Sequence, residues 1–414
     1  MRPEPRILQK LFGLAENERF EKVVEEYLAA IGRNPEYLAL YHALALYCAK
    51  SRRLDMAYVA LETALQQNPE HAGSWFHMGQ ILYEKMDFQG SVDCYRKSIE
   101  IEPSAKSIFH LSLSQLSAGY LADGATNYAY RFSDEDLTVF QKLSLWAPAA
   151  KSRKVLVWAE QGLGDEIMFS RFFVFLRDLP CEFTVECDRR LLRMYAENFP
   201  WLHFVQRPPK GQSRPPADLA GFDAHLPVGG LFTLWPERVH TPPLMEPVLR
   251  PVSEARPELD WCRQPGKQYV GISWLSMNED FGALRSVSMQ ALLSAFDPSR
   301  HALVNLQYLA PPQDLEMARH AGFELVDTAD CFSDVEGMAW LISRCDHVVS
   351  IDNTALHLAG AMGVHTWGLI PHLPNWRWQI CGGSCGWYPH VQLLVQEQEG
   401  SWNTELLKLR QLLS

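Results

Sequence analysis

Residues 346–363 read DHVVSIDNTALHLAGAMG, and they predict a strand, a polar turn and a helix in immediate succession. The run VVSI at 348–351 is rich in β-branched residues and is typical of a strand that is buried on both faces. Residues 352–354, Asp-Asn-Thr, favour the start of a helix, and Gly363 is the usual residue just past a helix end. We therefore expect a buried strand that passes directly into a helix.

The turn inside this stretch is predicted to bind the phosphates of a ligand. The first backbone N–H groups of a helix have no partners within the helix, and together with the helix dipole they attract anions. Thr354, Ala355 and Leu356 would supply these groups. His357 lies one turn further on, so its ring should reach the same place. Because a carboxylate beside a phosphate is repulsive, we assign Asp352 to helix capping or to the hydroxyls of a sugar or ribose.

Length and composition indicate a chain of several domains. At roughly 100 to 200 residues per domain, 414 residues correspond to two to four units. The formal net charge of -11 argues against nucleic acid as the main partner. The sequence shows neither a signal peptide nor an uninterrupted apolar run of about 18 residues, and its nine scattered cysteines fit a reducing compartment. We expect a soluble, cytoplasmic protein without a membrane span.

The amino-terminal third contains a repeat. Pro35, Pro69 and Pro103 lie 34 residues apart, which is the period of the tetratricopeptide repeat. Two units carry the large, small and aromatic residues of that pattern at Tyr41, Ala45, Cys48, Ala57, Leu61 and Ala64, and at Trp75, Gly79, Leu82, Ser91, Tyr95 and Ser98; a more degenerate first unit includes Leu11, Val23, Tyr27 and Ala30. We predict a helical repeat domain over 1–132, whose concave groove would hold a protein or peptide partner.

Alternating strand and helix patterns follow the repeats. Residues 133–153 are expected to be a linker, in which the acidic triplet at 134–136 is solvated and does not bind a metal. Residues 154–262 and 263–414 each predict a Rossmann-like, doubly wound α/β half, and the second half ends in a helix. Residues 257–266 would form the hinge. Two such sheets facing one another place their strand ends on a single cleft, where these folds bind ligands.

The first half opens with the turn AEQGLGDE at 159–166. It resembles a dinucleotide fingerprint only in part, because Ile167 stands where the third glycine would fall, so binding of NAD is not favoured. We assign Gln161, Gly162 and Gly164 to the acceptor side of the cleft, with the glycines allowing another molecule to approach closely.

Two carboxylates follow these glycines at the start of the next helix. Asp165 is our candidate for a catalytic general base, and Glu166 is the reserve candidate. A plain helix-capping role for Asp165 is about equally compatible with its position.

The second half supplies candidates for binding a sugar donor. Ser273 ends a predicted strand, and Arg285 lies in the polar loop beyond it. Arg285 is suited to neutralising a diphosphate leaving group without a metal, although a surface arginine fits its position as well. Trp376 and Trp378 follow a later strand, and they would either stack on a ligand or pack at the rim of the cleft.

With these residues in place, the chain resembles bacterial glycosyltransferases that join tetratricopeptide repeats to a GT-B domain related to the lipopolysaccharide heptosyltransferases. VLVWAEQGLGDEIMFSRF, VGISW with the later LRS, residues 348–363, PNWRW and WYP carry the resemblance. It implies that Asp165 is the base and that Asp352 to His357 match a donor-binding motif. Asn353 stands where that family usually has threonine, Thr354 stands where it has glycine, and Arg285 stands in for its lysine.

The resemblance implies a metal-independent, inverting glycosyltransferase without a cofactor. Its substrates would be a nucleotide sugar and a protein acceptor, such as flagellin, held by the repeats. Ser273, Arg285, Asp352, Asn353, Thr354 and His357 would form the donor side. Three alternatives remain open: a repeat-based binding scaffold with a degenerate transferase domain, a nucleotide-sugar epimerase, and a heptosyltransferase-like enzyme.

Overall fold

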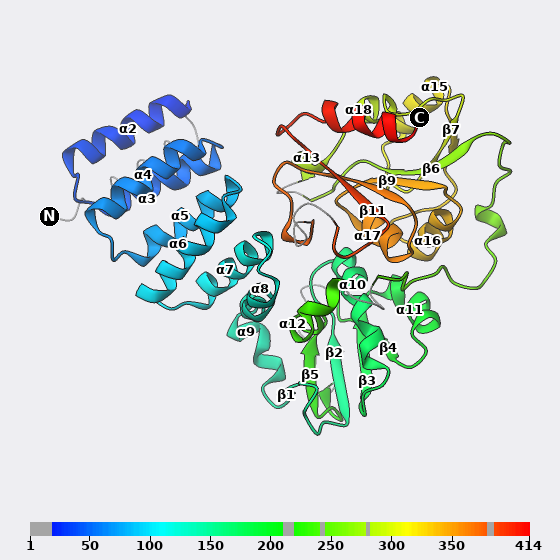
Figure 1. Cartoon of the computed structure of the whole chain (residues 1–414), viewed down its shortest axis with the longest axis horizontal. Helices are drawn as coiled ribbons and strands as arrows, with labels where there is room; N and C mark the ends of the chain where they lie inside the picture. Colours follow the sequence, from blue (N-terminus) through cyan, green and yellow to red (C-terminus); the bar gives the residue numbers. More distant parts are fainter. Residues whose placement is uncertain (1–18, 210–218, 241–244, 279–281, 379–384) are drawn as a thin grey trace. The chain divides into compact units, whose positions relative to one another are not determined.

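The computed structural model describes residues 19–209, 219–240, 245–278, 282–378 and 385–414 (Figure 1). The chain divides into two compact units between Ser133 and Asp134. The predicted first repeat is therefore described only in part, because Leu11 lies outside these ranges.

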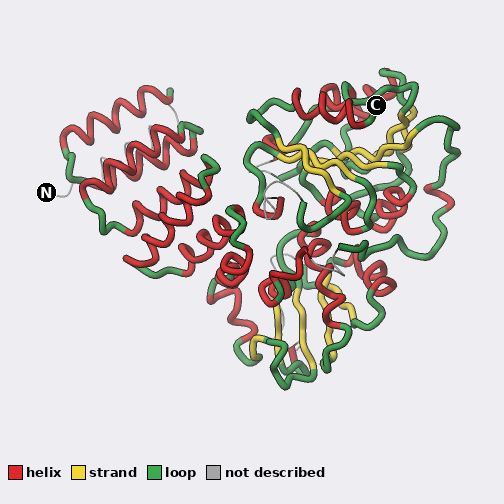
Figure 2. The backbone as a smooth tube through the Cα atoms, in the orientation of Figure 1, coloured by secondary structure: helices red, strands yellow, loops and turns green. Residues whose placement is uncertain are grey.

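The amino-terminal unit consists of antiparallel helix pairs (Figures 1 and 2). Its helices are α2 (Phe20–Arg33), α3 (Leu38–Lys50), α4 (Leu54–Gln67), α5 (Ala72–Glu84), α6 (Phe88–Ile101), α7 (Ala105–Ser117) and α8 (Leu121–Tyr128), followed by the 3₁₀ helix Ala129–Arg131. A Cβ atom on Gly79 would lie 3.0 Å from the ring of Tyr95, and the Ser91 hydroxyl donates to the Gly79 carbonyl over 2.7 Å. Small residues thus let α5 and α6 pack closely, as the repeat pattern predicts.

The second unit begins with a five-stranded parallel sheet in the order β1-β5-β2-β3-β4. Its strands are β1 (Ser144–Leu145), β2 (Lys154–Trp158), β3 (Glu182–Cys187), β4 (His203–Gln206) and β5 (Ala224–Pro227). Its helices are α9 (Asp134–Leu137), α10 (Leu163–Ser170), α11 (Leu192–Asn198) and α12 (Gly230–Leu234), with 3₁₀ helices at Thr138–Phe140, Arg171–Leu176, Arg189–Leu191 and Pro236–His240. Val155 and Val157 of β2 are fully buried, which accounts for the apolar run there.

The segment that we predict to be a linker, 133–153, does more than connect. Its strand β1 pairs with β5, and the side chains of Phe140 and Trp146 are buried. The Phe140 ring stacks on His225 with a centroid distance of 4.4 Å. Burial of these two aromatic rings makes the segment part of the first α/β half, and we correct the prediction accordingly.

A six-stranded parallel sheet forms the other half, in the order β11-β10-β9-β6-β7-β8 (Figure 2). Its strands are β6 (Gln268–Ser273), β7 (His301–Asn305), β8 (Glu324–Val326), β9 (His347–Ile351), β10 (Thr366–Ile370) and β11 (Val391–Val395). Its helices are α13 (Gly282–Arg285), α14 (Met289–Leu293), α15 (Pro312–His320), α16 (Val335–Ser343), α17 (Thr354–Ala361) and α18 (Asn403–Leu412), with 3₁₀ helices at Pro257–Leu259 and Trp376–Trp378.

The stretch 346–363 has the predicted structure. Strand β9 is paired on both sides, by β6 and β10, and it leads through Asp352 and Asn353 into α17. Gly363 has a positive φ of 73°, and a Cβ atom there would lie 2.4 Å from Pro247. Only glycine suits this left-handed position, so the predicted helix end is confirmed.

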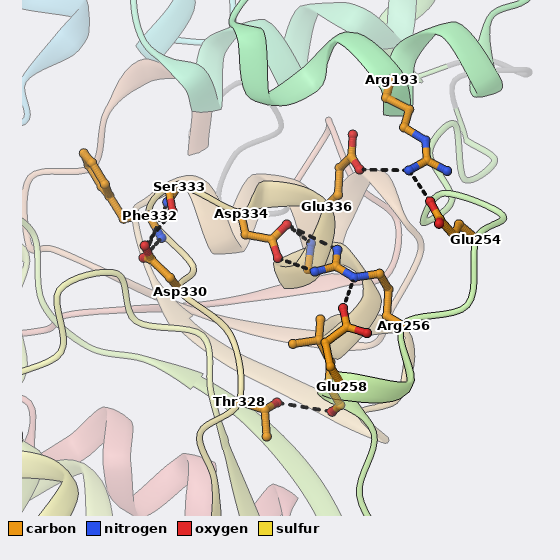
Figure 3. A network of polar contacts seen from close by, with 12 residues as sticks. Arg193, Glu254, Arg256, Glu258, Thr328, Asp330, Phe332, Ser333, Asp334 and Glu336 are labelled. Atoms are coloured by element: carbon orange, nitrogen blue, oxygen red, sulfur yellow. Dashed lines mark hydrogen bonds and ion pairs between the residues drawn. The ribbon is translucent and has the colours of Figure 1, made fainter.

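The two halves are joined by a connector, whose described part is residues 245–267. A polar network joins this connector to helix α16 (Figure 3). Arg256 of the connector forms an ion pair of 2.6 Å with Asp334, which also accepts the Gly337 N–H at the start of α16. From the first half, Arg193 contacts Glu254 at 2.5 Å and Glu336 at 3.9 Å. The network ties the connector to both halves close to the hinge that the sequence predicts at 257–266.

Candidate functional site

A cavity of about 410 Å³ lies between the two α/β halves. Its lining comes from five segments, each of which follows the carboxyl end of a parallel strand: β2, β6, β7, β9 and β10. The lining residues are Gly162, Leu163, Gly164, Asp165, Ser276, Asn278, Arg285, Tyr308, Asp352, Asn353, Thr354, His357, Asn375 and Arg377. The cavity therefore occupies the place where doubly wound sheets bind ligands.

Asp165 lies on the first-half wall of this cavity. Helix α10 begins after Gly162, whose N–H donates to Oδ2 of Asp165 over 3.1 Å, so the carboxylate does cap its own helix. Its other oxygen, Oδ1, forms an ion pair with Nη2 of Arg377 from the second half. Gln161 precedes this turn with a positive φ of 60°, and its side-chain oxygen accepts a hydrogen bond of 2.7 Å from Arg377. Gln161, however, is not among the lining residues of the cavity.

Glu166 points elsewhere, although it is the neighbour of Asp165. It is buried, accepts the Asp188 N–H over 2.7 Å, and forms an ion pair of 2.7 Å with Arg207. Burial raises the pKa of Glu166 to about 7, against the opposing effect of Arg207. Because it does not line the cavity, we withdraw it as the reserve catalytic base.

The two glycines of the turn differ in what they allow. A Cβ atom on Gly164 would lie 2.8 Å from Cδ2 of His357, whereas one on Gly162 would meet Asp165 at an ordinary 3.5 Å. We predicted that the glycines admit another molecule. At Gly164 the close approach is instead that of helix α17, which packs on α10 within the same unit.

The second-half turn is organised by Asn353. Its Oδ1 accepts the Ala355 N–H over 3.0 Å, and its Nδ2 donates to the Ser273 hydroxyl over 2.7 Å. One of the three backbone donors that we assigned to a phosphate is therefore occupied by the helix cap. Ser273 is buried, binds Gln307, and lies behind the cavity wall, so its predicted contact with a donor is corrected to support of Asn353.

Asp352 and Arg285 both line the cavity, and their side chains form an ion pair in its wall. Nη1 of Arg285 lies 3.5 Å from Oδ2 of Asp352. The Asp352 side chain is 8% exposed and that of Arg285 is 25% exposed, so the pair is partly shielded from water. Asn353 caps the helix, which leaves Asp352 as the charge partner of Arg285 and not as a cap.

His357 is a buried, uncharged member of the cavity wall. Burial lowers its pKa to about 4, although the carboxylates of Asp352 and Asp165 act in the opposite direction. Its Nδ1 shares a hydrogen bond of 3.0 Å with the Tyr388 hydroxyl, and its ring stacks on Trp378 at 4.9 Å. At neutral pH it offers a polar ring without a charge.

The tryptophans that we predicted at the rim are interior residues. Trp376 and Trp378 are 3% and 1% exposed. Trp376 stacks on Phe232 of the first half at 5.8 Å. Neither ring lines the cavity, and both fix the loop that carries Arg377. The alternative of packed rings is thus the better description.

Sequence reasoning missed Arg377, Asn375 and Tyr308. Arg377 lies in the WRW segment, for which the sequence predicts a role only for the rings, and it extends from there to Asp165. A charged residue between two tryptophans after a strand end was the available signal. Tyr308 follows β7 in the same way that Ser276 follows β6, so strand order could have indicated it.

The tetratricopeptide repeat family model matches residues 72–104. This stretch is a tetratricopeptide repeat. Protein FlbA of Caulobacter vibrioides is 24% identical over 432 aligned positions, which span 94% of this chain and 69% of that protein. The tetratricopeptide repeat-containing protein trd-1 of Caenorhabditis elegans is 24% identical over 136 positions, which cover 30% of this chain and 17% of that protein.

Solved structures also resemble this chain. TTC0263, a tetratricopeptide repeat protein of Thermus thermophilus, is 22% identical and covers 32% of this chain and 73% of its own, with a TM-score of 0.27. Tetratricopeptide repeats suggest that the amino-terminal unit binds a protein partner. Among the described residues, no helix is long and apolar enough to cross a membrane, and no three His, Cys, Asp or Glu side chains are placed to hold a metal ion.

Proposed function

We propose that the second unit is a metal-independent, inverting glycosyltransferase with a GT-B arrangement, which moves a sugar from a nucleotide-sugar donor to a protein acceptor. The observation that carries the proposal is the polar cavity between the strand ends of two parallel sheets, with a carboxylate on one wall and an arginine and a helix start on the other. Flagellin is one candidate acceptor, by the family resemblance alone.

The residues divide the chemistry between the two walls. Asp165 takes the proton of an acceptor hydroxyl as that oxygen forms a bond to the anomeric carbon of the sugar. The bond between this carbon and the phosphate oxygen breaks, and its electron pair leaves with the nucleoside diphosphate. Arg285 and the backbone N–H of Thr354, at the start of α17, stabilise the departing charge.

The repeats supply the acceptor side of the proposal. Since tetratricopeptide repeats bind polypeptides, they would select the protein that is modified. The same observation favours a second candidate, a binding scaffold whose transferase domain is degenerate. The scaffold is supported by the ion pairs of the cavity: Arg285 and Arg377 both already have carboxylate partners, so neither arginine is set aside for a phosphate.

A nucleotide titration distinguishes the two functions. UDP, ADP, GDP and CMP, and their sugar conjugates, are added to the full chain while its melting temperature is recorded. A transferase should be stabilised by nucleotides that carry one particular nucleobase, and a scaffold should be stabilised by none of them. Asp165→Asn should then abolish transfer to the acceptor, while the variant binds the nucleotide at least as tightly as the wild type does. A fully active Asp165→Asn variant would show that Asp165 is not the base.

A further inference from the structure

The charges that line the cavity cancel. Asp165 and Asp352 face Arg377 and Arg285 in two ion pairs, and His357 is uncharged at neutral pH. A nucleoside diphosphate brings at least two negative charges. Its phosphates gain the full charge of an arginine when that arginine turns away from its carboxylate.

Arg377 is held so that its side chain can exchange partners while its backbone stays in place. The flanking Trp376 and Trp378 are buried, which anchors the 3₁₀ helix. The guanidinium donates through Nη1 to Asn375 over 2.7 Å and through Nη2 to Gln161 over 2.7 Å, and it also pairs with Asp165. The side chain is 12% exposed and lines the cavity. It therefore lies within reach of a ligand there.

The ion pair with Arg377 also involves the candidate catalytic base, Asp165. Oδ1 of Asp165 faces Arg377, and Oδ2 accepts the Gly162 N–H. An acceptor hydroxyl must donate to one of these two oxygens before its proton can be transferred. When Arg377 moves away, the lone pair of Oδ1 that faces it also becomes available to the hydroxyl.

We infer that Arg377 is a second ligand of the donor diphosphate and that it leaves Asp165 for the phosphates when the donor binds, so that the base is released only beside a bound donor. No covalent bond changes in this exchange. It replaces one charge-assisted contact with another, and the proton transfer described above follows it. The inference rests on the proposed function, and it implies that the donor binds before the acceptor.

The test is a double-mutant cycle on nucleotide binding, measured by calorimetry on the full chain with the nucleoside diphosphate that stabilises it. Arg377→Gln should weaken binding by about tenfold or more, which is the effect of losing a charged hydrogen bond. Asp165→Asn should strengthen binding by about threefold or more, because Arg377 no longer has to leave a carboxylate. In the Arg377→Gln background, Asp165→Asn should strengthen binding much less, because only the repulsion between the carboxylate and the phosphates is then removed.

Arg344→Gln is the matched control. Arg344 forms an ion pair of 2.7 Å with Asp260 and does not line the cavity, so its loss should leave nucleotide affinity unchanged. If the wild type binds a nucleoside diphosphate but Asp165→Asn binds it no more tightly, the exchange is wrong and the proposed function stands. That result does not depend on how well Arg377→Gln folds. If the wild type binds no nucleotide, the proposed function fails together with the exchange.

Discussion

The Tyr388 hydroxyl lies 3.0 Å from Nδ1 of His357, and both side chains are buried. The Tyr388 ring also packs on α17, since a Cβ atom on Gly360 would lie 2.5 Å from its Cγ. Tyr388 thus supports the helix and fixes the His357 ring in the cavity wall. The hydrogen bond leaves Nε2 as the ring nitrogen that is available to a ligand.

Tyr388→Phe tests this support, because it removes the hydroxyl and keeps the ring. Nδ1 of His357 would then be left in a buried place without its partner. We expect a loss of about 1 to 3 kcal/mol in the free energy of unfolding, measured with urea. A variant as stable as the wild type would show that His357 finds another partner.

The pKa of His357 predicts a dependence of stability on pH. Its folded-state pKa of about 4 is below the usual value of 6.5, so between these values the unfolded chain binds the proton more tightly. Stability should therefore fall as the pH is lowered from about 6.5 to about 4, by about 3 kcal/mol for this group. His42 and His110 of the amino-terminal unit have similarly lowered pKa values. The measurement is thus the difference in slope between the wild type and His357→Gln, and equal slopes would contradict the prediction.

Glu166 should give the opposite slope. Burial raises its pKa from 4.5 to about 7, so the folded protein binds the proton more tightly between these values. Its contribution to stability is present below about pH 4.5 and is lost as the pH rises through about 7. Glu166→Gln should remove that loss. The measurement is the free energy of unfolding of the wild type and of Glu166→Gln between about pH 4.5 and about pH 7. Nucleotide binding should be unchanged, because Glu166 lies outside the cavity. A variant that keeps the wild-type slope would rule out this assignment.

The contrast between Asp165 and Glu166 shows what the sequence could not reveal. Adjacent positions on a helix point about 100° apart, so only one of them can face the cavity. Which one does so depends on Arg207, a distant residue that attracts Glu166 to the other side. The partner of Asp165 is equally remote, because Arg377 comes from a different sheet.

Local signals, in contrast, were sufficient for the stretch 346–363. Its β-branched run, its polar turn and Gly363 all act over a few residues, and strand, turn and helix have the predicted order. The parallel order of the strands then brought the predicted segments to one cavity. The occupation of the Ala355 N–H by Asn353 was not foreseen, since an asparagine at that position can cap the helix or contact a ligand.

Gly164→Ala tests the close packing of α10 on α17. The added methyl group would lie 2.8 Å from the His357 ring, which is buried and stacked on Trp378 and has little room to move. We expect a loss of about 1 to 3 kcal/mol in the free energy of unfolding. Gly162→Ala is the control, since its methyl group meets Asp165 at 3.5 Å and its φ of -100° suits any residue. Equal effects of the two substitutions would contradict the packing argument.

Phe140→Ala tests whether residues 133–153 belong to the first α/β half. The Phe140 ring is 3% exposed and stacks on both His225 and Trp158, so its removal leaves a cavity against the sheet. We expect a loss of about 3 to 5 kcal/mol in the free energy of unfolding of the second unit. Leu145→Ala is the control from the same segment, because Leu145 is 65% exposed and should cost less than about 0.5 kcal/mol. If Phe140→Ala costs no more than Leu145→Ala, the segment is only a connection between domains, as its sequence first suggests.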